Sequence, residues 1–537
     1  MAAVLDLPGL IASRRPGYSL PAPFYLSPDI YQRDLSLIFG RHWIFVGVEP
    51  EIPETGDLFT VDIGNDSIII VRDDELAVRA FHNVCRHRGA RVRPEGRGVV
   101  GNLVCPYHQW TYNLRGELVH NQHMGEDFER CRFGLKPVHI ESLAGLLFIC
   151  LADTPAQGFD EMRAAIERYI APHNIGNCKV AFQKDIIEHG NWKLTMENNR
   201  ECYHCSANHP ELTVSLLEYG FGYQPSMENV EQVKGFEDLL ARQHQRWEAC
   251  GLPSAEIDRL EHVTGFRTVR LPMVHAGESQ TLDTKVASLK PLNEFEQLDL
   301  GGLSFWTQPN SWHHFMSDHI VSFCVLPLSP HKSVLRTRWL VHKDAREGVD
   351  YDLKRLTEVW DATNDQDSAL VANAHQGILS SAYQPGPYSP YTEGLVDKFC
   401  NWYLNRLGAG LAPASGAVCP NPARTDRPIR TATIAATSGT GASAAGASTA
   451  PQYSITFGQT GRVVPCRADQ TILAAAESAG LPLPFSCREG RCGTCRTRLV
   501  SGQVDMKHAG GIRQRQIDQG DVLLCCSRPL SDVVLAK

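Results

Sequence analysis

A tract of small residues near the C-terminus constrains the organisation of this 537-residue chain more than any other feature. Between Thr431 and Ala450 every residue except Ile434 is Ala, Gly, Ser or Thr. Such a tract offers too little apolar surface to form a core, so it predicts a flexible tether. We place this linker at residues 412–452 and expect an r.m.s. span of roughly 35 Å. The chain therefore divides into a large body and a small C-terminal domain.

The composition is that of a globular protein. Apolar residues make up 43% of the chain and charged residues 21%, and no apolar run approaches the roughly 18 residues of a membrane span. The N-terminus lacks a basic leader, so we expect a cytoplasmic location and no membrane partner. A net charge of −8 gives no reason to expect nucleic acid as a partner. Seventeen cysteines cluster beside His or Gly, which favours reduced thiols and metal ligation over a disulfide framework.

Local patterns predict an α+β protein. Ser27 and Pro28 read as an N-cap and first helical residue of a helix through about Phe39, within an N-terminal helical segment at 1–42. Short β-type runs separated by Gly and Asp turns predict a β-rich domain at 43–154. Residues 155–411 mix helical and strand patterns and predict an α+β domain, and residues 453–537 form the last domain.

Two loops of the β-rich domain each supply one Cys and one His: Cys85 with His87, and Cys105 with His108. A structural zinc site is one interpretation of this ligand set. However, zinc loops usually pair Cys with Cys and His with His. The mixed loops suit a [2Fe–2S] cluster in which two Cys bind one iron and two His bind the other. The stretches "CRHRGA" and "CPYHQWTY" resemble the loops of Rieske domains.

The C-terminal domain carries a second iron–sulfur pattern. Cys487, Cys492 and Cys495 lie in "SCREGRCGTC", and Cys525 follows after 29 residues. This is the C-x4-C-x2-C…C spacing of plant-type [2Fe–2S] ferredoxins. Cys526 is the alternative fourth ligand. The whole tail resembles the ferredoxin domains of oxygenase reductases, which implies a β-grasp fold.

The stretch "NRECYHCSANHPEL" contains two histidines five residues apart. On a regular helix His204 and His209 would diverge by about 140°, so the backbone must deviate between them, either through Pro210 or through a π-type turn. Two histidines and a distant carboxylate would make the facial triad of a non-haem Fe(II) site that binds O2 as cosubstrate. For the carboxylate we choose Asp367, at the start of a predicted helix. Asp365 and, less favourably, Asp361 are the alternates.

The three sites together resemble those of Rieske non-haem iron oxygenases. In that family an acid three residues before the first iron histidine links it to a Rieske histidine of the neighbouring subunit, a catalytic role that falls here to Glu201. Most members have Asp at this position. The resemblance implies a homotrimer, a helix-grip-like catalytic domain, and electron flow from ferredoxin to Rieske cluster to mononuclear iron.

Residues 20–410 also resemble glycine betaine monooxygenases and related demethylases, through stretches such as "PNSWHHFMSDH" and "SAYQPGPYSP". This implies N-demethylation of a quaternary amine with release of formaldehyde; glycine betaine is the first choice, and carnitine, choline and proline betaine are alternatives. A ring-hydroxylating dioxygenase for an aromatic acid and a non-enzymatic electron carrier are the competing classes. The chain shows no flavin or nicotinamide motif, so a separate NAD(P)H-dependent flavin reductase must supply the electrons.

Several side chains are candidates for substrate contact. Aromatic faces suit a quaternary ammonium group, and a substrate carboxylate would need a cationic or N–H donor. The candidates are Trp306, Trp312, Phe305 and Tyr203 for the cation, with core packing as the alternative, and His313 and His314 for the acid.

Other cysteines are expected to pack in the interior. Cys202 and Cys205 are assigned packing roles instead of iron ligation, and Cys131, Cys150, Cys178, Cys250, Cys324 and Cys400 are predicted to be buried fillers.

The charge is unevenly distributed along the chain. Eleven Lys/Arg against seven Asp/Glu give the tail +4, while residues 1–411 carry −14. We expect four tail arginines to help dock the ferredoxin domain on the acidic body: Arg488, Arg491, Arg496 and Arg498.

Overall fold

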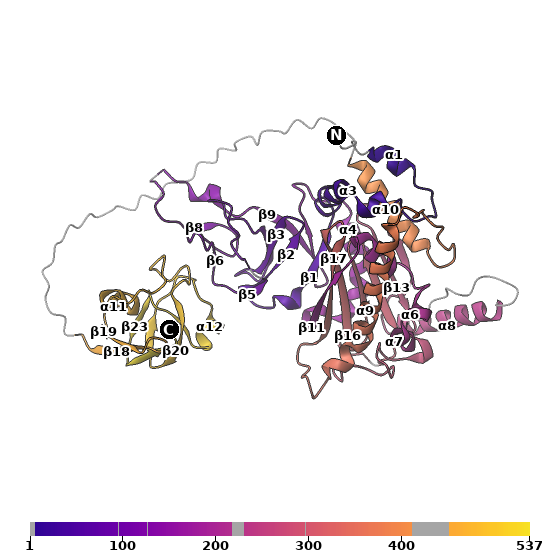
Figure 1. The fold of residues 1–537 in the computed structure, drawn as a ribbon. Helices are drawn as coiled ribbons and strands as arrows, with labels where there is room; N and C mark the ends of the chain where they lie inside the picture. The colour runs from indigo at the N-terminus through magenta and orange to yellow at the C-terminus, as the bar shows by residue number, and fades with distance from the viewer. Residues whose placement is uncertain (1–5, 95, 126, 217–229, 296, 411–449) are drawn as a thin grey trace, which may run out of the picture. The chain divides into compact units, whose positions relative to one another are not determined.

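The computed structural model describes residues 6–94, 96–125, 127–216, 230–295, 297–410 and 450–537. The chain forms two compact units, Met1–Gly410 and Leu411–Lys537 (Figure 1). Nearly all of the predicted linker lies outside the described residues. Within the described residues, no helix combines the length and apolar character needed to cross a membrane.

The N-terminal segment is helical, as predicted. It contains α1 (Leu7–Ala12), α2 (Pro23–Leu26) and α3 (Pro28–Arg33). The Ser27 side chain accepts a hydrogen bond from the Ile30 amide, which confirms the predicted N-cap. After α3 the helix continues as a π-helix, η1 (Asp34–Phe39), so the predicted helix ends where expected but widens in its second half.

The β-rich region contains two antiparallel sheets. The larger has the order β1-β10-β9-β4-β3-β2-β5, and the smaller has the order β6-β7-β8. The strands are β1 (Ile44–Val48), β2 (Asp57–Ile63), β3 (Asp66–Arg72), β4 (Val78–His82), β5 (Arg97–Val99), β6 (Leu103–Val104), β7 (Thr111–Tyr112), β8 (Leu118–His120), β9 (Pro137–Leu143) and β10 (Leu146–Cys150). The loops before β5 and before β7 carry the predicted Cys and His residues.

A seven-stranded antiparallel sheet forms the scaffold of the next region, in the order β11-β17-β16-β15-β14-β13-β12. Its strands are β11 (Cys178–Glu188), β12 (Ile257–Arg259), β13 (Phe266–Leu271), β14 (Gly302–Thr307), β15 (Ser311–Phe315), β16 (His319–Ser329) and β17 (Lys332–His342). Successive side chains of a strand point to opposite faces, so this sheet presents two different surfaces.

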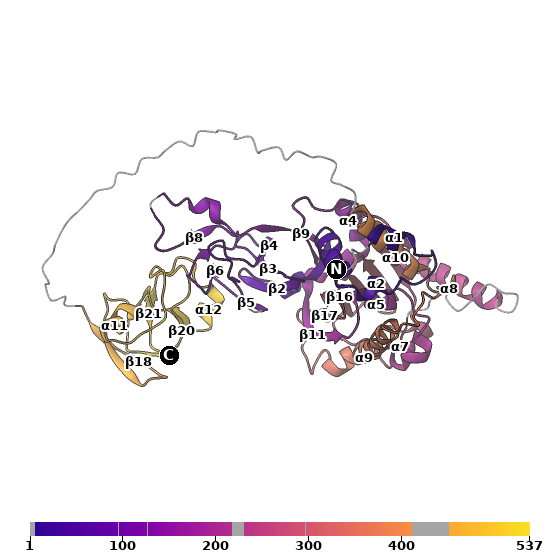
Figure 2. The same cartoon turned by 45° about the horizontal axis from the view of Figure 1, so that its top comes forward.

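The same region contains α4 (Phe159–Ile170), α5 (Trp192–Asn199), α6 (Cys205–Asn208), α7 (Pro210–Val214), α8 (Val230–Ala249), α9 (Leu353–Ile378) and α10 (Gly394–Ala409). Of these helices, α5 packs on β16 and β17 of the sheet. The long helix α9 contacts β11, α5 and α7, and Figure 2 shows α7 beside it. Asn364 of α9 donates a hydrogen bond to Thr337 Oγ1 of β17, at 3.0 Å, which fixes the helix on the sheet.

The start of α9 corrects one prediction. Asp352 caps the helix by accepting a hydrogen bond from the Arg355 amide, at 2.9 Å. Asp367 therefore lies in the helix interior and not at its start. The polar run around residue 365 suggested a helix terminus, but these polar side chains belong to faces of one continuous helix.

The C-terminal unit combines a mixed five-stranded sheet, β19-β18-β24-β20-β22, with a short β21-β23 pair. Its elements are β18 (Gln452–Phe457), β19 (Arg462–Arg467), α11 (Ile472–Ser478), β20 (Arg496–Ser501), β21 (Val504–Met506), α12 (Gln514–Asp518), β22 (Asp521–Leu523), β23 (Ser527–Pro529) and β24 (Val533–Leu535). The helix α11 packs its buried side chains into the same core as the sheet, as in the expected β-grasp fold.

Candidate functional site

The two histidines of the opening motif lie at a break between two short helices. His204 precedes α6, and His209 lies between α6 and α7 in an extended-type conformation, with φ −122° and ψ 70°. Pro210 begins α7. The backbone thus leaves the helix at His209, as predicted from the proline. The imidazole centroids come within 5.0 Å of each other, with the rings at 83°.

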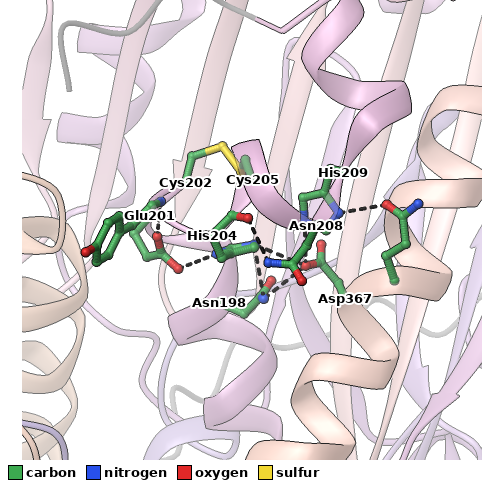
Figure 3. Close-up of a disulfide and its surroundings, with 10 residues drawn as sticks. Asn198, Glu201, Cys202, His204, Cys205, Asn208, His209 and Asp367 are labelled. Carbon is green, nitrogen blue, oxygen red and sulfur yellow. Dashed lines mark hydrogen bonds and ion pairs between the residues drawn. A yellow bond between two sulfur atoms is a disulfide. The ribbon is translucent and has the colours of Figure 1, made fainter. Parts of the chain in front are cut away.

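Both imidazoles face Asp367. The distance to Asp367 Oδ1 is 3.2 Å from His204 Nε2 and 3.0 Å from His209 Nε2 (Figure 3). Asn198 also donates to the same carboxylate oxygen, at 3.0 Å. The structure therefore brings the two predicted histidines, from the two ends of α6, together with the preferred aspartate from α9.

The other ring nitrogens are held by oxygen acceptors. His204 Nδ1 lies 2.5 Å from Glu201 Oε1, and His209 Nδ1 lies 2.8 Å from Gln366 Oε1. Gln366 is itself oriented by a hydrogen bond from its amide nitrogen to Glu211, at 2.8 Å. Since a carboxylate or amide oxygen keeps a proton on Nδ1, the Nε2 lone pairs are directed into the site. No sequence motif had singled out Gln366.

The electrostatics of the site favour positive charge. Burial opposes a charged imidazole, but hydrogen bonds to Asp367 and Glu201 raise the pKa of His204 to about 9. Burial likewise opposes a charged carboxylate, yet the hydrogen bonds from His204 and His209 lower the pKa of Asp367. Two carboxylates thus surround the imidazoles, and a metal cation at this position would replace the proton on Nε2.

The donor set fits a divalent non-haem iron ion. Two imidazole nitrogens and one carboxylate oxygen converge, and His209 Nε2 is buried 3.0 Å from Asp367 Oδ1. The alternate acids Asp365 and Asp361 lie instead beside Lys184, at 3.2 Å and 3.3 Å. Cys205 lies near the two histidines but its sulfur is engaged elsewhere.

Cys202 and Cys205 are joined by a disulfide, so the prediction that they are packing thiols is wrong. Their spacing of three residues places both sulfurs on the same side of the short turn that contains His204. The prediction of buried fillers holds for Cys150, Cys178, Cys324 and Cys400, but is wrong for Cys131 and Cys250, which are exposed. Cys131 lies in a short 3-10 helix on the surface and Cys250 directly follows α8.

A cavity of about 130 Å³ opens beside the two histidines and Asp367. Its aromatic wall includes Trp306, His314 and Trp360. Trp360 is an addition to the predicted set, and it lies on the same face of α9 as Asp367, seven residues away. Its indole stacks on His314 at 4.9 Å and donates to Gln280 Oε1 at 2.9 Å.

Strand alternation explains which of the other predicted pocket residues fall outside the cavity. Phe305 and His313 are buried on the opposite face of the sheet from Trp306, where His313 contacts Phe45. Trp312 shares the face of Trp306 but stacks on Phe323 in the core. Tyr203 is largely exposed.

The predicted Rieske ligands lie at the tips of two neighbouring loops. Cys85 and Cys105 are buried, and the rings of His87 and His108 lie 4.5 Å apart. The Tyr112 hydroxyl lies 3.3 Å from Cys85 Sγ. His87 Nδ1 is buried without a partner among the described residues, so the loops fit a cluster that would take this nitrogen as a ligand. His108 is exposed, which brings one ring to the surface.

The four predicted ferredoxin cysteines are all buried in the second unit: Cys487, Cys492, Cys495 and Cys525. Cys487 Sγ accepts backbone hydrogen bonds from Glu489, Arg491 and Cys492, at 3.2–3.4 Å. Contact with Cys492 and Cys525, together with these amides, lowers the pKa of Cys487, as a thiolate ligand requires. Cys526 is only half-buried and contacts the Leu523 carbonyl.

The four arginines proposed for docking have carboxylates nearby in their own unit. Arg488 lies 2.7 Å from Glu477 and Arg491 lies 2.9 Å from Glu489. Arg498 and Arg496 both lie near Asp521, at 3.1 Å and 3.8 Å. These local pairs offset part of the positive charge, and docking stays a prediction.

The protein has the features of one class, the Rieske-type non-haem iron oxygenases. These features are the fold, the two candidate iron–sulfur sites and the His–His–Asp site. Three family models match: the Rieske [2Fe-2S] domain over residues 42–139, the ring hydroxylating alpha subunit catalytic domain over 175–409, and the 2Fe-2S iron-sulfur cluster binding domain over 455–530. The fold also resembles that of the quaternary ammonium Rieske monooxygenase CntA, with a TM-score of 0.54 at 21% identity over 74% of this chain and 97% of that one. The α+β fold expected from the sequence is confirmed.

Closely similar sequences narrow the class to a family. The chain is 45% identical over 416 residues to a "Glycine betaine monooxygenase oxygenase subunit" of Chromohalobacter salexigens, covering 76% of this chain and 91% of the relative. It is 43% identical over 412 residues to a subunit of the same description from Pseudomonas aeruginosa, covering 76% and 94%. The chain therefore belongs to the family of these oxygenase subunits, which are monooxygenase components.

Proposed function

We propose that this protein is the oxygenase component of a monooxygenase that removes one N-methyl group from glycine betaine, giving dimethylglycine and formaldehyde. The observation that carries the proposal is the convergence of His204, His209 and Asp367 beside a cavity walled by Trp306 and Trp360. The 45% identity to glycine betaine monooxygenase subunits supports the choice of substrate.

We assign the site residues as follows. Cys85, His87, Cys105 and His108 would hold a Rieske [2Fe–2S] cluster; Cys487, Cys492, Cys495 and Cys525 a plant-type [2Fe–2S] cluster; His204, His209 and Asp367 an Fe(II) ion. When bound, these groups would supply single electrons and activate O2 for insertion into a C–H bond.

The residues around the metal site have distinct tasks. Glu201 and Gln366 would keep protons on the Nδ1 atoms, which orients both rings toward the metal position. Asn198 donates a hydrogen bond to Asp367 and lines the cavity. The indole of Trp360, held by Gln280, offers a face to a trimethylammonium group, which cannot donate an N–H hydrogen bond. Hydroxylation of an N-methyl carbon gives a carbinolamine, which releases formaldehyde and the tertiary amine.

Partners complete the proposal. A separate NAD(P)H-dependent flavin reductase would supply electrons, and Glu201 would contact the Rieske histidine of a neighbouring subunit in a homotrimer. We retain the domain division at 1–42, 43–154, 155–411, 412–452 and 453–537 as part of this proposal. Localisation in the cytoplasm stays a prediction from the sequence.

The decisive experiment is turnover with defined substrates. Purified protein, a flavin reductase and NADH are supplied with glycine betaine, carnitine, choline, proline betaine or an aromatic acid such as salicylate. We expect formaldehyde in step with O2 uptake, fastest with glycine betaine. A cis-diol or hydroxylated aromatic product, without formaldehyde from any amine, would favour the aromatic-acid oxygenase instead.

Metal analysis provides an independent test. Anaerobically purified protein should contain four cluster irons and one mononuclear iron per chain. His204→Ala should lose the mononuclear iron and formaldehyde production while both cluster EPR signals persist. Zinc in place of iron would contradict the proposal.

A further inference from the structure

The cavity beside the metal site contains a buried cation that has no carboxylate partner among the residues that the structure describes. Arg200 is fully buried and lines the cavity. Within the described ranges, its guanidinium donates only to neutral oxygens, those of Asn199, Thr307, Gln308 and Ser311, at 2.8–3.4 Å. Neutral carbonyl groups do not neutralise a buried charge, so this arrangement is costly unless an anion joins it.

A second arginine lies close by. Arg267 of β13 and Trp306 of β14 are paired across the strands, so both side chains lie on the cavity face. The guanidinium carbons of Arg200 and Arg267 lie over the Trp306 ring, 4.9 Å and 5.1 Å from its centroid. Burial and, to a smaller extent, the charge of Arg267 lower the pKa of Arg200 to about 9.

Two N–H groups in this cluster are also without acceptors. Arg200 Nε and Trp306 Nε1 are buried and have no hydrogen-bond partner within the described part of the chain. Burying a donor without an acceptor is unfavourable, and an anion in the cavity would satisfy such groups. The carboxylates of the cavity wall cannot do so, because Glu201 and Asp367 are engaged by the histidines.

We propose that Arg200, Arg267 and Trp306 form a carboxylate subsite, which makes the enzyme selective for quaternary ammonium compounds that carry an acid group. The inference rests on the proposed function and specifies the substrate class: a betaine in preference to an alcohol such as choline. The acid end lies at the arginines, and the trimethylammonium end lies toward Trp360 and the metal site.

This assignment differs from the expectation that histidines bind the acid. His313 lies on the other face of the sheet. Burial lowers the pKa of His314 to about 3, so His314 is a neutral ring stacked on Trp360. The guanidinium groups over Trp306 also leave Trp360 as the aromatic face for the ammonium group.

Arg267→Gln is the test variant, because Arg200 is fully buried and its replacement could disturb folding. Arg267 pairs with Glu256 at 2.7 Å, and Glu256 is about half exposed, so the change leaves no buried unpaired acid. Arg336→Gln is the matched control. It removes a comparable arginine, paired with Asp185 at 2.6 Å, that lies outside the cavity. Both variants must retain wild-type iron content and cluster spectra.

The readout is the ratio of kcat/KM for glycine betaine to that for choline. Loss of a charge-assisted hydrogen bond predicts that Arg267→Gln lowers this ratio roughly 10- to 100-fold, mainly through KM for glycine betaine. Arg267→Lys should restore part of it, and Arg336→Gln should leave the ratio at the wild-type value. An equal loss with both substrates, or no loss with glycine betaine, overturns the subsite.

Calorimetric binding to the anaerobic holoenzyme separates this inference from the proposed function. If no quaternary amine binds or turns over, the proposed function fails, and the same variants are titrated with salicylate. Salicylate binding that weakens at least tenfold in Arg267→Gln and not in Arg336→Gln would still support a carboxylate subsite. If salicylate binds equally well to the wild type and to Arg267→Gln, the proposed carboxylate subsite is wrong.

As a second variant, Trp306→Phe removes the indole N–H and keeps an aromatic ring. We expect a several-fold rise in KM for glycine betaine relative to choline. A change of the opposite sign would place the ammonium group, and not the carboxylate, at Trp306.

Discussion

The two candidate iron–sulfur sites differ in the groups that contact their cysteine sulfurs. In the Rieske-type site, a side chain, Tyr112, contacts Cys85 Sγ, and one of the two histidines is exposed. In the ferredoxin-type site all four cysteines are buried, and backbone amides of residues 489, 491 and 492 point at Cys487 Sγ. The first site thus combines a side-chain hydroxyl at Cys85, which a mutation can remove, with backbone hydrogen bonds from Tyr107 and His108 at Cys105. In the second site, the donors to Cys487 Sγ are backbone amides.

Removing one ligand from each site should have the largest effect and separate their tasks. Cys85→Ala should abolish formaldehyde production under all conditions. Cys495→Ala should abolish turnover driven by the reductase, but a sample reduced with dithionite before O2 is added should still give one round of product. EPR of each variant should show loss of its own cluster signal only. Steady turnover of Cys495→Ala with the reductase would contradict the proposed electron order.

Glycine substitutions test the dependence on the backbone. Gly493 has φ +73°, and an added Cβ would lie 2.6 Å from the Gly511 carbonyl oxygen. Strain and overlap together predict a loss of about 2–4 kcal/mol in the free energy of unfolding of the ferredoxin domain, and loss of its cluster. Visible absorbance during thermal unfolding provides the measurement.

Gly89 in the Rieske-type loop is the matched control. Its φ is +76°, but an added Cβ would meet no atom within 4 Å. Only the backbone strain of about 1 kcal/mol applies, so Gly89→Ala should keep its cluster. Equal damage in the two variants would show that the difference between the sites is not one of backbone packing.

Tyr112→Phe should produce a smaller change that is confined to one site. With Cys85 as a thiolate, the hydroxyl donates a hydrogen bond that stabilises the reduced cluster. Its loss should lower the Rieske reduction potential by roughly 20–60 mV. The ferredoxin potential in the same chain is the internal control in a redox titration. An unchanged Rieske potential would show that the Tyr112 hydroxyl does not stabilise the reduced cluster.

Cys526→Ser should have the smallest effect. Because Cys526 Sγ contacts the Leu523 carbonyl, we expect an unaltered ferredoxin spectrum, whereas Cys525→Ser should lose or alter it. The reverse result would make Cys526 the fourth ligand.

Particular residues show which features can be predicted from local sequence patterns and which cannot. The Cys and His spacings of both iron–sulfur sites, the tether, and the break at Pro210 all depend on neighbours along the chain. The structure confirms the break at His209. The tether lies almost wholly outside the described residues, and the cluster ligands stay a prediction. The position of Asp367 within α9 was misjudged, because the polar run around it resembled a helix start. Phe305 and His313 are plausible substrate contacts by residue type, but strand alternation places both on the face of the sheet opposite the cavity. Arg267 and Gln366 carried no motif at all.

By itself, the sequence determined the ligand types, the local backbone break at the histidines, and the separation into two units, because these follow from short-range spacing and composition. Only the tertiary structure decided which acid meets His204 and His209, that Arg200 and Arg267 flank one indole, and that Cys202 joins Cys205. Long-range contacts depend on the packing of α9 against the sheet and on strand register, which place residues more than a hundred positions apart within a few ångströms.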